Sequence, residues 1–367
     1  MSSNKNKKDI LFLGLHRPNR SPSQRYRIEQ FLPALEKNKR TYEYEYLLSE
    51  AMDKKFYAPG AFFSKGIIVL KSVLKLLAIS FIRARKFEYV FVQREAFMLG
   101  TAFFEKAIAK RSKLIFDFDD SIWLANVSEA NKKLAFLKNP NKIKQIIQAA
   151  HVNIVGNHFL QEYARQFSEA VELIPTCIDT NEYSRSSPLR PKIDNTVCIG
   201  WSGSQTTIEH FKLAIPFLEA IKKKYGNRIY FKVIGDASYQ HKELEINGVE
   251  WTKETEIREL EEIDIGIMPL PDDEWSKGKC GLKGLVYMSM EIPSVLSAVG
   301  VNKKIILDQE NGLLCTTDES WVKKLSLLIE NKDLRQKLGE AGRKTVVKKY
   351  SINANKNHFL SLLDGKA

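Results

Sequence analysis

Short apolar runs of strand length recur along the whole chain and alternate with helical patterns. In the first half they predict strands at 10–15, 44–48, 89–92, 114–118, 153–155 and 172–174. In the second half they predict strands at 197–201, 230–234, 265–268, 294–297 and 313–315. Apolar strands that alternate with helices are typical of βα units, whose parallel strands are buried on both faces. We therefore predict an α/β fold with doubly wound sheets.

A polar, proline-containing stretch from Pro175 to Asn195 separates two sets of βα units of similar size, as expected of a linker between domains. With 367 residues the chain is long enough for two domains, each with its own core. We predict an N-terminal domain over 1–185 and a C-terminal domain over 186–350, both Rossmann-like and facing a cleft. In such sheets ligands bind at the carboxyl ends of strands, so the loops that follow strands are where chemistry is expected.

The formal net charge of +13 is unevenly distributed. Residues 1–190 contain 31 Lys and Arg against 19 Asp and Glu, whereas residues 191–367 contain 26 against 25. The positive excess therefore belongs to the N-terminal half, and it predicts an anionic partner there: a membrane surface, nucleic acid or a phosphorylated substrate. No recognised nucleic-acid-binding module accompanies the charge, so nucleic acid is the least favoured of the three.

The cysteines and the start of the chain indicate the cellular compartment in which the protein is expected. Cys177, Cys198, Cys280 and Cys315 are widely spaced and form no CxxC or Cys/His cluster, which argues against a disulfide framework and a structural zinc site. The start of the chain is polar and leads into a strand pattern without the apolar core of a signal peptide. We therefore expect a cytoplasmic protein.

Residues 66–82 are strongly apolar, but Lys71 and Lys75 interrupt them and basic residues follow. The segment is too short and too charged for a membrane span. The two lysines lie one turn apart, which predicts a helix with a narrow basic stripe on a broad apolar surface. Two interpretations stay open: a helix packed on a sheet, and a helix docked at a bilayer surface.

Two loops in the first half carry charged candidates. Arg25 and Arg27 follow the first strand, and a planar guanidinium suits phosphate or carboxylate. Asp117, Asp119 and Asp120 stand at the end of the strand at 114–118, where neighbouring carboxylates repel one another. Metal binding, hydrogen bonding to sugar hydroxyls and base catalysis are the functional interpretations. The alternatives are solvent-exposed arginines and helix capping by Asp119 or Asp120.

The corresponding loops in the second half suit a phosphate-bearing ligand. Gly203 and Ser204 follow the strand at 197–201, and Gly235 and Asp236 follow the strand at 230–234. Glycine lets a ligand approach the backbone, while hydroxyls and amides meet phosphate oxygens. Each of these motifs is weak by itself.

The stretch Lys279-Cys280-Gly281-Leu282-Lys283 follows the strand at 265–268 and an acidic loop at 271–274. It is predicted to open a helix that runs to about Glu291. Free N–H groups at a helix start, a glycine, and lysines one turn apart together suit a phosphate. The alternative is a solvated helix start with ordinary lysines. No GxGxxG, Walker A loop, HExxH or serine-nucleophile elbow is present in the sequence.

Several segments recur in one bacterial group of enzymes in the order found here. They are Ser23-Gln24-Arg25-Tyr26-Arg27, 116–123, Val155-Gly156-Asn157, Ile174-Pro175-Thr176, 199–204, 264–299 and 311–351. On these segments, which span nearly the whole chain, the sequence resembles the family-4 glycosyltransferases of the GT-B fold, in their bacterial polysaccharide-biosynthesis branch.

The resemblance implies a retaining transferase that moves a sugar from a nucleotide-diphosphate-sugar donor to a saccharide or lipid-linked acceptor. It implies a role in cell-surface polysaccharide or glycolipid synthesis. The basic N-terminal half adds the expectation of a peripheral position at the inner face of the plasma membrane. The C-terminal domain would bind the donor and the N-terminal domain the acceptor, with the final helix at 351–367 crossing back to the first domain. No metal or other cofactor is expected, because helix N-terminal amides and basic side chains neutralise the departing diphosphate.

The resemblance and the strand-end rule together select the candidate site residues. Lys283 is the candidate for stabilising the transition state, Asp119 and Asp120 for acceptor contact or proton handling, and Arg25, Arg27 and Asp117 for contact with the acceptor or a phosphate. The residues expected to bind the donor are Gly203, Ser204, Gly235, Asp236, Met268, Leu270, Lys279, Gly281, Leu282 and Lys283.

The sequence departs from the family pattern at the donor site. Gly278 and Val286 stand where the family has a pair of glutamates, the second of which holds the donor ribose. Ser202-Gly203-Ser204 replaces a common Arg/Lys pair, and Glu291 replaces a usual glycine. Two alternatives to transfer therefore stay open: a nucleotide-sugar epimerase or hydrolase on the same fold, and a non-catalytic homologue that binds nucleotide sugars.

Overall fold

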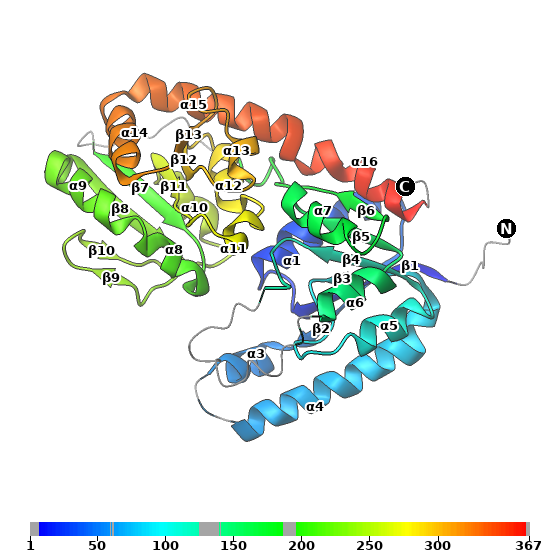
Figure 1. Cartoon of the computed structure of the whole chain (residues 1–367). Coiled ribbons are helices and arrows are strands. Elements are labelled where there is room, and N and C mark those ends of the chain that lie inside the picture. Colours follow the sequence, from blue (N-terminus) through cyan, green and yellow to red (C-terminus); the bar gives the residue numbers. More distant parts are fainter. Residues whose placement is uncertain are drawn as a thin grey trace. The chain divides into compact units, whose positions relative to one another are not determined.

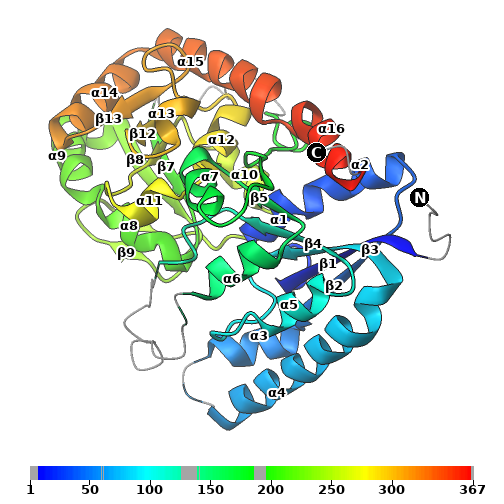
Figure 2. The ribbon, with the colours of Figure 1, turned by 45° about the vertical axis from the view of Figure 1, so that its right-hand side comes forward.

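The computed structural model describes residues 7–58, 60, 62–124, 139, 141–185 and 196–364. The chain divides into two compact units (Figures 1 and 2). Unit 1 comprises the residues up to Thr176 together with those from Lys356 onward, and unit 2 runs from Cys177 to Asn355. The domain boundary predicted after residue 185 adjoins residues 186–195, which lie outside the described part of the chain.

A six-stranded parallel sheet forms the centre of unit 1, with the strand order β2-β1-β3-β4-β5-β6. Consecutive residues of its central strands are buried, as Ile10, Leu11 and Phe12 are in β1. Such strands need a cover on both faces, which in parallel sheets is provided by helices. The strands are β1 (Lys8–His16), β2 (Tyr42–Leu48), β3 (Phe87–Gln93), β4 (Lys113–Phe118), β5 (Val152–Val155) and β6 (Val171–Leu173).

Helices lie on both sides of this sheet. In Figures 1 and 2, α4 (Phe62–Ala78), α5 (Phe103–Ala109) and α7 (His158–Arg165) lie along one side of the sheet, and the end of the last helix lies on the other. The last residues of α16 (Ile352–Leu363) belong to unit 1, where the Phe359 ring stacks on Phe31 with centroids 4.5 Å apart. The other helices of the unit are α1 (Pro22–Arg27), α2 (Leu32–Lys37), α3 (Glu50–Tyr57) and α6 (Lys142–Ala149).

Unit 2 contains a five-stranded parallel sheet with the order β13-β12-β11-β7-β8. A short antiparallel pair, β9 (Gln240–His241) and β10 (Ile246–Asn247), follows β8. The strands of the main sheet are β7 (Val197–Ser202), β8 (Ile229–Ile234), β11 (Ile265–Met268), β12 (Ser294–Ser297) and β13 (Leu313–Cys315).

The two faces of this sheet have different covers, because successive strand residues point to opposite faces. Ile265 and Ile267 of β11 join a core with Phe217 of α9 (Ile215–Tyr225) and Trp321 of α14 (Asp318–Glu330). Between them, Gly266 leaves room for α12 (Leu282–Ser289), since a Cβ there would lie 2.5 Å from the Tyr287 ring. The remaining helices are α8 (Ile208–Lys212), α10 (Glu256–Glu261), α11 (Glu274–Lys277), α13 (Asn302–Ile305) and α15 (Lys332–Thr345).

Eleven predicted strands are present, and their ends lie within two residues of the predicted ones. The prediction of an α/β fold with two doubly wound parallel sheets is therefore confirmed. The pair β9 and β10 was not predicted, because two residues per strand give no periodicity.

Candidate functional site

Gly203 and Gly235 stand at the carboxyl ends of β7 and β8, where the donor was expected. The N–H of Gly203 donates to the Ile234 carbonyl at 2.9 Å. Gly235 has a φ of +130°, and a Cβ on it would lie only 1.9 Å from the Gly203 carbonyl oxygen. The two strand-end loops therefore pack directly on each other. The packing of the protein itself requires glycine at both positions.

The polar side chains beside these glycines stabilise local turns. Ser204 caps a short 3-10 helix at Gln205–Thr207, with its hydroxyl 2.9 Å from that of Thr206. Asp236 accepts hydrogen bonds from the N–H and the hydroxyl of Ser238, at 3.0 and 2.6 Å. Both side chains are partly exposed at this edge of the sheet.

Met268 and Leu270, at the end of β11, lie in the interior of unit 2 with exposed fractions of 3% and 7%. The N–H of Leu270 donates to the Ser297 hydroxyl at 2.8 Å, which ties the β11 loop to β12. These residues therefore hold the shape of the strand edge rather than present side chains to solvent.

The helix after β11 begins later than predicted. The expected acidic loop is in part the start of α11, because Asp273 caps that helix by accepting the N–H of Ser276 at 2.7 Å. Gly281 then adopts a left-handed conformation with φ +72°, and α12 runs from Leu282 to Ser289. A Cβ on Gly281 would lie 2.3 Å from Ile305, so this position needs glycine for its backbone and for its packing.

Lys279 and Lys283 are consequently not one turn apart on a single helix. Lys283 lies in the first turn of α12, with its Nζ 5.2 Å from the centre of the Trp201 ring. Lys279 precedes the helix, and its Nζ lies 5.0 Å from the centre of the Trp275 ring. The first N–H groups of a helix have no hydrogen-bond partners within the helix. Of the two lysines, Lys283 is the one that lies in the turn containing these N–H groups.

Gly278 and Val286, which occupy the positions of the family's two glutamates, have structural roles in unit 2. Gly278 ends α11, where its N–H donates to the Trp275 carbonyl at 3.1 Å. Val286 is buried in α12, with an exposed fraction of 6%.

Arg27 and Asp117 of unit 1, which were expected to contact an acceptor or a phosphate, bind each other. The Arg27 Nε lies 3.0 and 3.1 Å from the two carboxylate oxygens, and Nη2 also donates to Asp117. Both side chains are buried, with exposed fractions of 3% and 1%. Burial raises the pKa of Asp117 to about 6 against the opposing effect of the Arg27 guanidinium, so the pair is ionised at neutral pH.

Arg25 is buried as well, which excludes the alternative of a solvent-exposed arginine. Asp119 accepts a hydrogen bond from the Ser23 hydroxyl at 2.5 Å, and Asp120 lies 3.6 Å from Arg94. Residues 122–124 form a turn and a bend, and Ser121 is not helical either, so no helix begins there for Asp119 or Asp120 to cap; residues 125–138 lie outside the described part. The two carboxylates stay candidates for acceptor contact.

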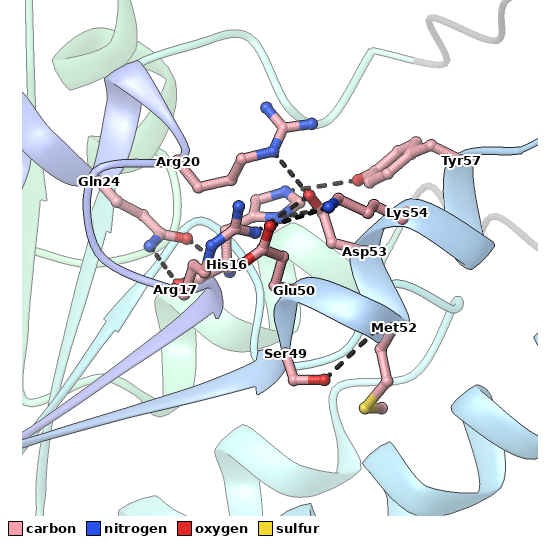
Figure 3. A network of polar contacts seen from close by, with 10 residues as sticks. All are labelled: His16, Arg17, Arg20, Gln24, Ser49, Glu50, Met52, Asp53, Lys54 and Tyr57. Atoms are coloured by element: carbon pink, nitrogen blue, oxygen red, sulfur yellow. Dashed lines mark hydrogen bonds and ion pairs between the residues drawn. The ribbon is translucent and has the colours of Figure 1, made fainter. Parts of the chain in front are cut away.

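A polar cluster at the end of β1 was missed in the sequence analysis (Figure 3). His16, the last residue of β1, has its Nδ1 3.3 Å from the Asp53 carboxylate on α3 and its Nε2 3.4 Å from the Tyr57 hydroxyl. Arg17 and Arg20 approach the other oxygen of Asp53 at 3.3 and 2.7 Å. We name these five residues the β1 cluster. The strand-end rule could have selected His16, but nothing local marks Asp53, which lies in the middle of a helix.

The described residues contain neither a candidate metal site nor a candidate membrane-spanning helix. No group of three or more His, Cys, Asp or Glu side chains in the described part has an arrangement that could hold a metal ion. In the same part of the chain, no helix combines the length and the apolarity needed to span a bilayer.

Comparison with known structures defines the fold. A sucrose-phosphate synthase from Thermosynechococcus elongatus aligns with a TM-score of 0.71 at 12% identity, over 98% of this chain and 99% of that one. HepE from Anabaena, in complex with UDP and glucose, aligns with a TM-score of 0.67 at 15% identity, over 97% and 99%. A glycosyltransferase from Rickettsia africae aligns with a TM-score of 0.66 at 16% identity, over 98% and 99%. The two Rossmann-like sheets are therefore those of the GT-B fold.

Comparison of sequences gives the class of enzyme. Residues 196–331, most of unit 2, match the family described as "Glycosyl transferases group 1". No curated protein matches the chain in sequence. The chain is a transferase, a glycosyltransferase with a group 1 domain, and its resemblance to such enzymes is confirmed.

Proposed function

We propose that the protein is a retaining glycosyltransferase that uses a nucleotide-diphosphate-sugar donor and a saccharide or lipid-linked acceptor. Its place would be the synthesis of a cell-surface polysaccharide or glycolipid. The observation that carries the proposal is the start of α12 within the matched domain, where Lys283 joins the first N–H groups of the helix. HepE, which shares the fold, is in complex with UDP and glucose.

The donor diphosphate is proposed to bind at the start of α12. There the helix amides and the Lys283 ammonium neutralise the negative charge that develops as the bond to the sugar breaks. Gly281 fixes the direction of the helix through its left-handed turn. In this proposal the charge is neutralised without a metal ion or another cofactor.

The absence of carboxylates at Gly278 and Val286 supports a second candidate, a homologue that binds nucleotide sugars without transferring them. Neither residue offers a group that can accept a hydrogen bond from ribose through its side chain. Under the main proposal, ribose is held by other groups. The two candidates differ in turnover and agree in donor binding.

A thermal-shift screen with UDP-, GDP-, ADP- and dTDP-sugars tests donor binding. A ligand that binds only the native state adds about 2.7 kcal/mol of stability at a hundredfold excess over Kd, so one class of donor should raise Tm clearly. Radiolabelled donor with and without glycoside acceptors then separates transfer from hydrolysis and epimerisation, because only transfer requires the acceptor. No shift with any of the donors would contradict both candidates.

We further propose that unit 1 binds an anionic membrane surface through α4. One face of α4 packs inward, where Ile68 and Leu76 are buried with exposed fractions of 4% and 0%. The opposite face is apolar and exposed, with Leu70 and Leu74 each 58% accessible. We name this face the α4 stripe; it comprises Phe62, Phe63, Ile67, Leu70, Leu74 and Leu77, and Ile82 is exposed in the turn that follows the helix.

The charges around the α4 stripe favour an anionic bilayer as its partner. The helix contains no acidic residue, while Lys71, Arg85 and Lys86 are exposed on it or just beyond it. Lys75 is not part of the basic surface, since its Nζ lies 2.6 Å from Glu45. Exposed apolar residues at helical spacing with flanking cations are typical of helices that lie in a membrane interface.

The double substitution Leu70→Gln and Leu74→Gln should weaken binding to phosphatidylglycerol-containing vesicles at least tenfold, because it removes two side chains that bury apolar area in the bilayer. Co-sedimentation measures the effect. Leu213→Gln with Leu327→Gln is the matched control, since both leucines are 45% exposed in unit 2. Equal binding by the two double variants would contradict a role for the stripe.

A further inference from the structure

We propose that His16 accepts a hydrogen bond from a hydroxyl of the acceptor, in the place where the Tyr57 hydroxyl now lies, with Asp53 fixing the imidazole. This inference rests on the proposed function and names a residue that selects the acceptor. The group that His16 recognises is an uncharged hydroxyl.

The backbone of His16 is held rigidly. Gln24 accepts a hydrogen bond from the His16 N–H at 2.9 Å and donates one to its carbonyl at 2.7 Å. The Gln24 amide also donates to the Tyr44 hydroxyl at 2.7 Å, and its side chain fills the space beside Gly14, where a Cβ would lie 2.9 Å away. The imidazole therefore projects from a fixed position at the carboxyl end of β1, the edge at which ligands of such sheets bind.

The contacts of the imidazole are incomplete. His16 Nδ1 and Asp53 Oδ1 are buried and face each other at 3.3 Å, yet neither completes a hydrogen bond of good geometry. On the other side of the ring, the contact from Nε2 to the Tyr57 hydroxyl is 3.4 Å long. Tyr57 itself is 56% exposed, so this side of the ring borders solvent. The 3.4 Å contact is longer than a good hydrogen bond, so Nε2 keeps the capacity to accept one from a ligand.

The charges that face His16 favour its neutral form. Burial lowers the pKa of the imidazole; Asp53 opposes this effect, and Arg20 and Arg17 add to it. The Tyr57 hydroxyl also faces the ring, 3.4 Å from Nε2. A neutral imidazole that directs its Nδ1–H toward Asp53 leaves the Nε2 lone pair to accept a hydrogen bond.

The charged side chains around the β1 cluster are paired with opposite charges. Arg17 and Arg20 lie against Asp53, and Lys54 lies 3.0 Å from Glu50. Arg94 lies 3.6 Å from Asp120 and also interacts electrostatically with Asp119, Glu95 and Tyr57. Cations that are already paired suit a site for sugar hydroxyls, whereas a phosphate would require cations without such partners.

The test compares His16→Ala, His16→Gln and the control His151→Ala. UDP-glucose serves as the donor probe and p-nitrophenyl glucosides as acceptor probes, or the sugar nucleotide selected by the thermal-shift screen. His16→Ala should raise KM for the acceptor and lower kcat/KM for it about tenfold, the loss of one good hydrogen bond. His16→Gln keeps an acceptor atom that does not titrate. It should therefore retain more activity and lose the acidic limb of the pH profile, where the wild-type imidazole becomes protonated.

His151 precedes β5 and is exposed, so its substitution should leave acceptor kinetics unchanged. Wild-type kcat/KM and an unchanged acidic limb in both folded His16 variants would overturn the inference while leaving the proposed function intact. Absence of transfer by the wild-type protein, with donor binding present, would overturn the proposed function and the inference together.

Discussion

Replacing Lys283 with alanine should lower donor turnover about a hundredfold, the usual effect of removing one group that stabilises developing charge. The ammonium lies in the first turn of α12, so its loss removes positive charge from the place where the diphosphate is proposed to bind. The fold should survive, because the Trp201 ring beneath Lys283 is 1% exposed and keeps its packing in the core. Turnover of labelled donor at saturating concentration measures the effect.

Lys277→Ala is the matched control for this substitution. Lys277 lies in the neighbouring helix α11, and its Nζ is 2.7 Å from Glu274. Lys283→Arg should recover part of the activity, since it restores the charge on a different geometry. If folded Lys283→Ala turned over donor at the wild-type rate, Lys283 would have no part in the chemistry.

Asp117→Asn should be among the most destabilising single substitutions in unit 1, with a loss of about 3–5 kcal/mol in the free energy of unfolding. It removes the negative charge of Asp117 from beside the buried Arg27 guanidinium, and arginine does not lose its proton inside proteins. Arg27→Met should cost less. Burial already raises the pKa of Asp117 to about 6, so without Arg27 the carboxyl takes up a proton and becomes neutral.

Guanidinium titrations measure these losses, with Glu209→Gln as a control that breaks an exposed pair between Glu209 and Lys212. The double variant Arg27→Met with Asp117→Leu should be more stable than Asp117→Asn, because it removes both charges together. Equal losses for the two single variants would contradict the asymmetry derived from the pKa of Asp117.

The strands were predictable from the sequence because parallel strands are buried on both faces and therefore read as short uninterrupted apolar runs. The start of α12 was placed too early. Two structural features precede it, the short helix α11 and the left-handed turn at Gly281. The periodicity of apolar residues does not distinguish them from the start of α12. Conformations with positive φ depend on the neighbouring packing, here on Ile305.

The pairing of candidate residues could not be read from the sequence. Arg27 and Asp117 are separated by 90 residues and meet only because β1 and β4 belong to one sheet. Taken separately, each looked like a ligand-binding group at a strand end. His16 and Asp53 show the opposite case, since a lone aspartate in a helix gives no local sign that a histidine faces it.

The last helix has a consequence for how the chain is made. Phe359, Leu362 and Leu363 of α16 are buried in unit 1, and the Phe359 ring lies against those of Phe31 and Phe91 from its first part. All of unit 2 is synthesised between these two parts. On the ribosome, unit 1 is therefore translated first but lacks part of its core until residue 363 has emerged, whereas unit 2 has its residues together earlier. The half of the chain that begins first is thus the half that completes its folding last.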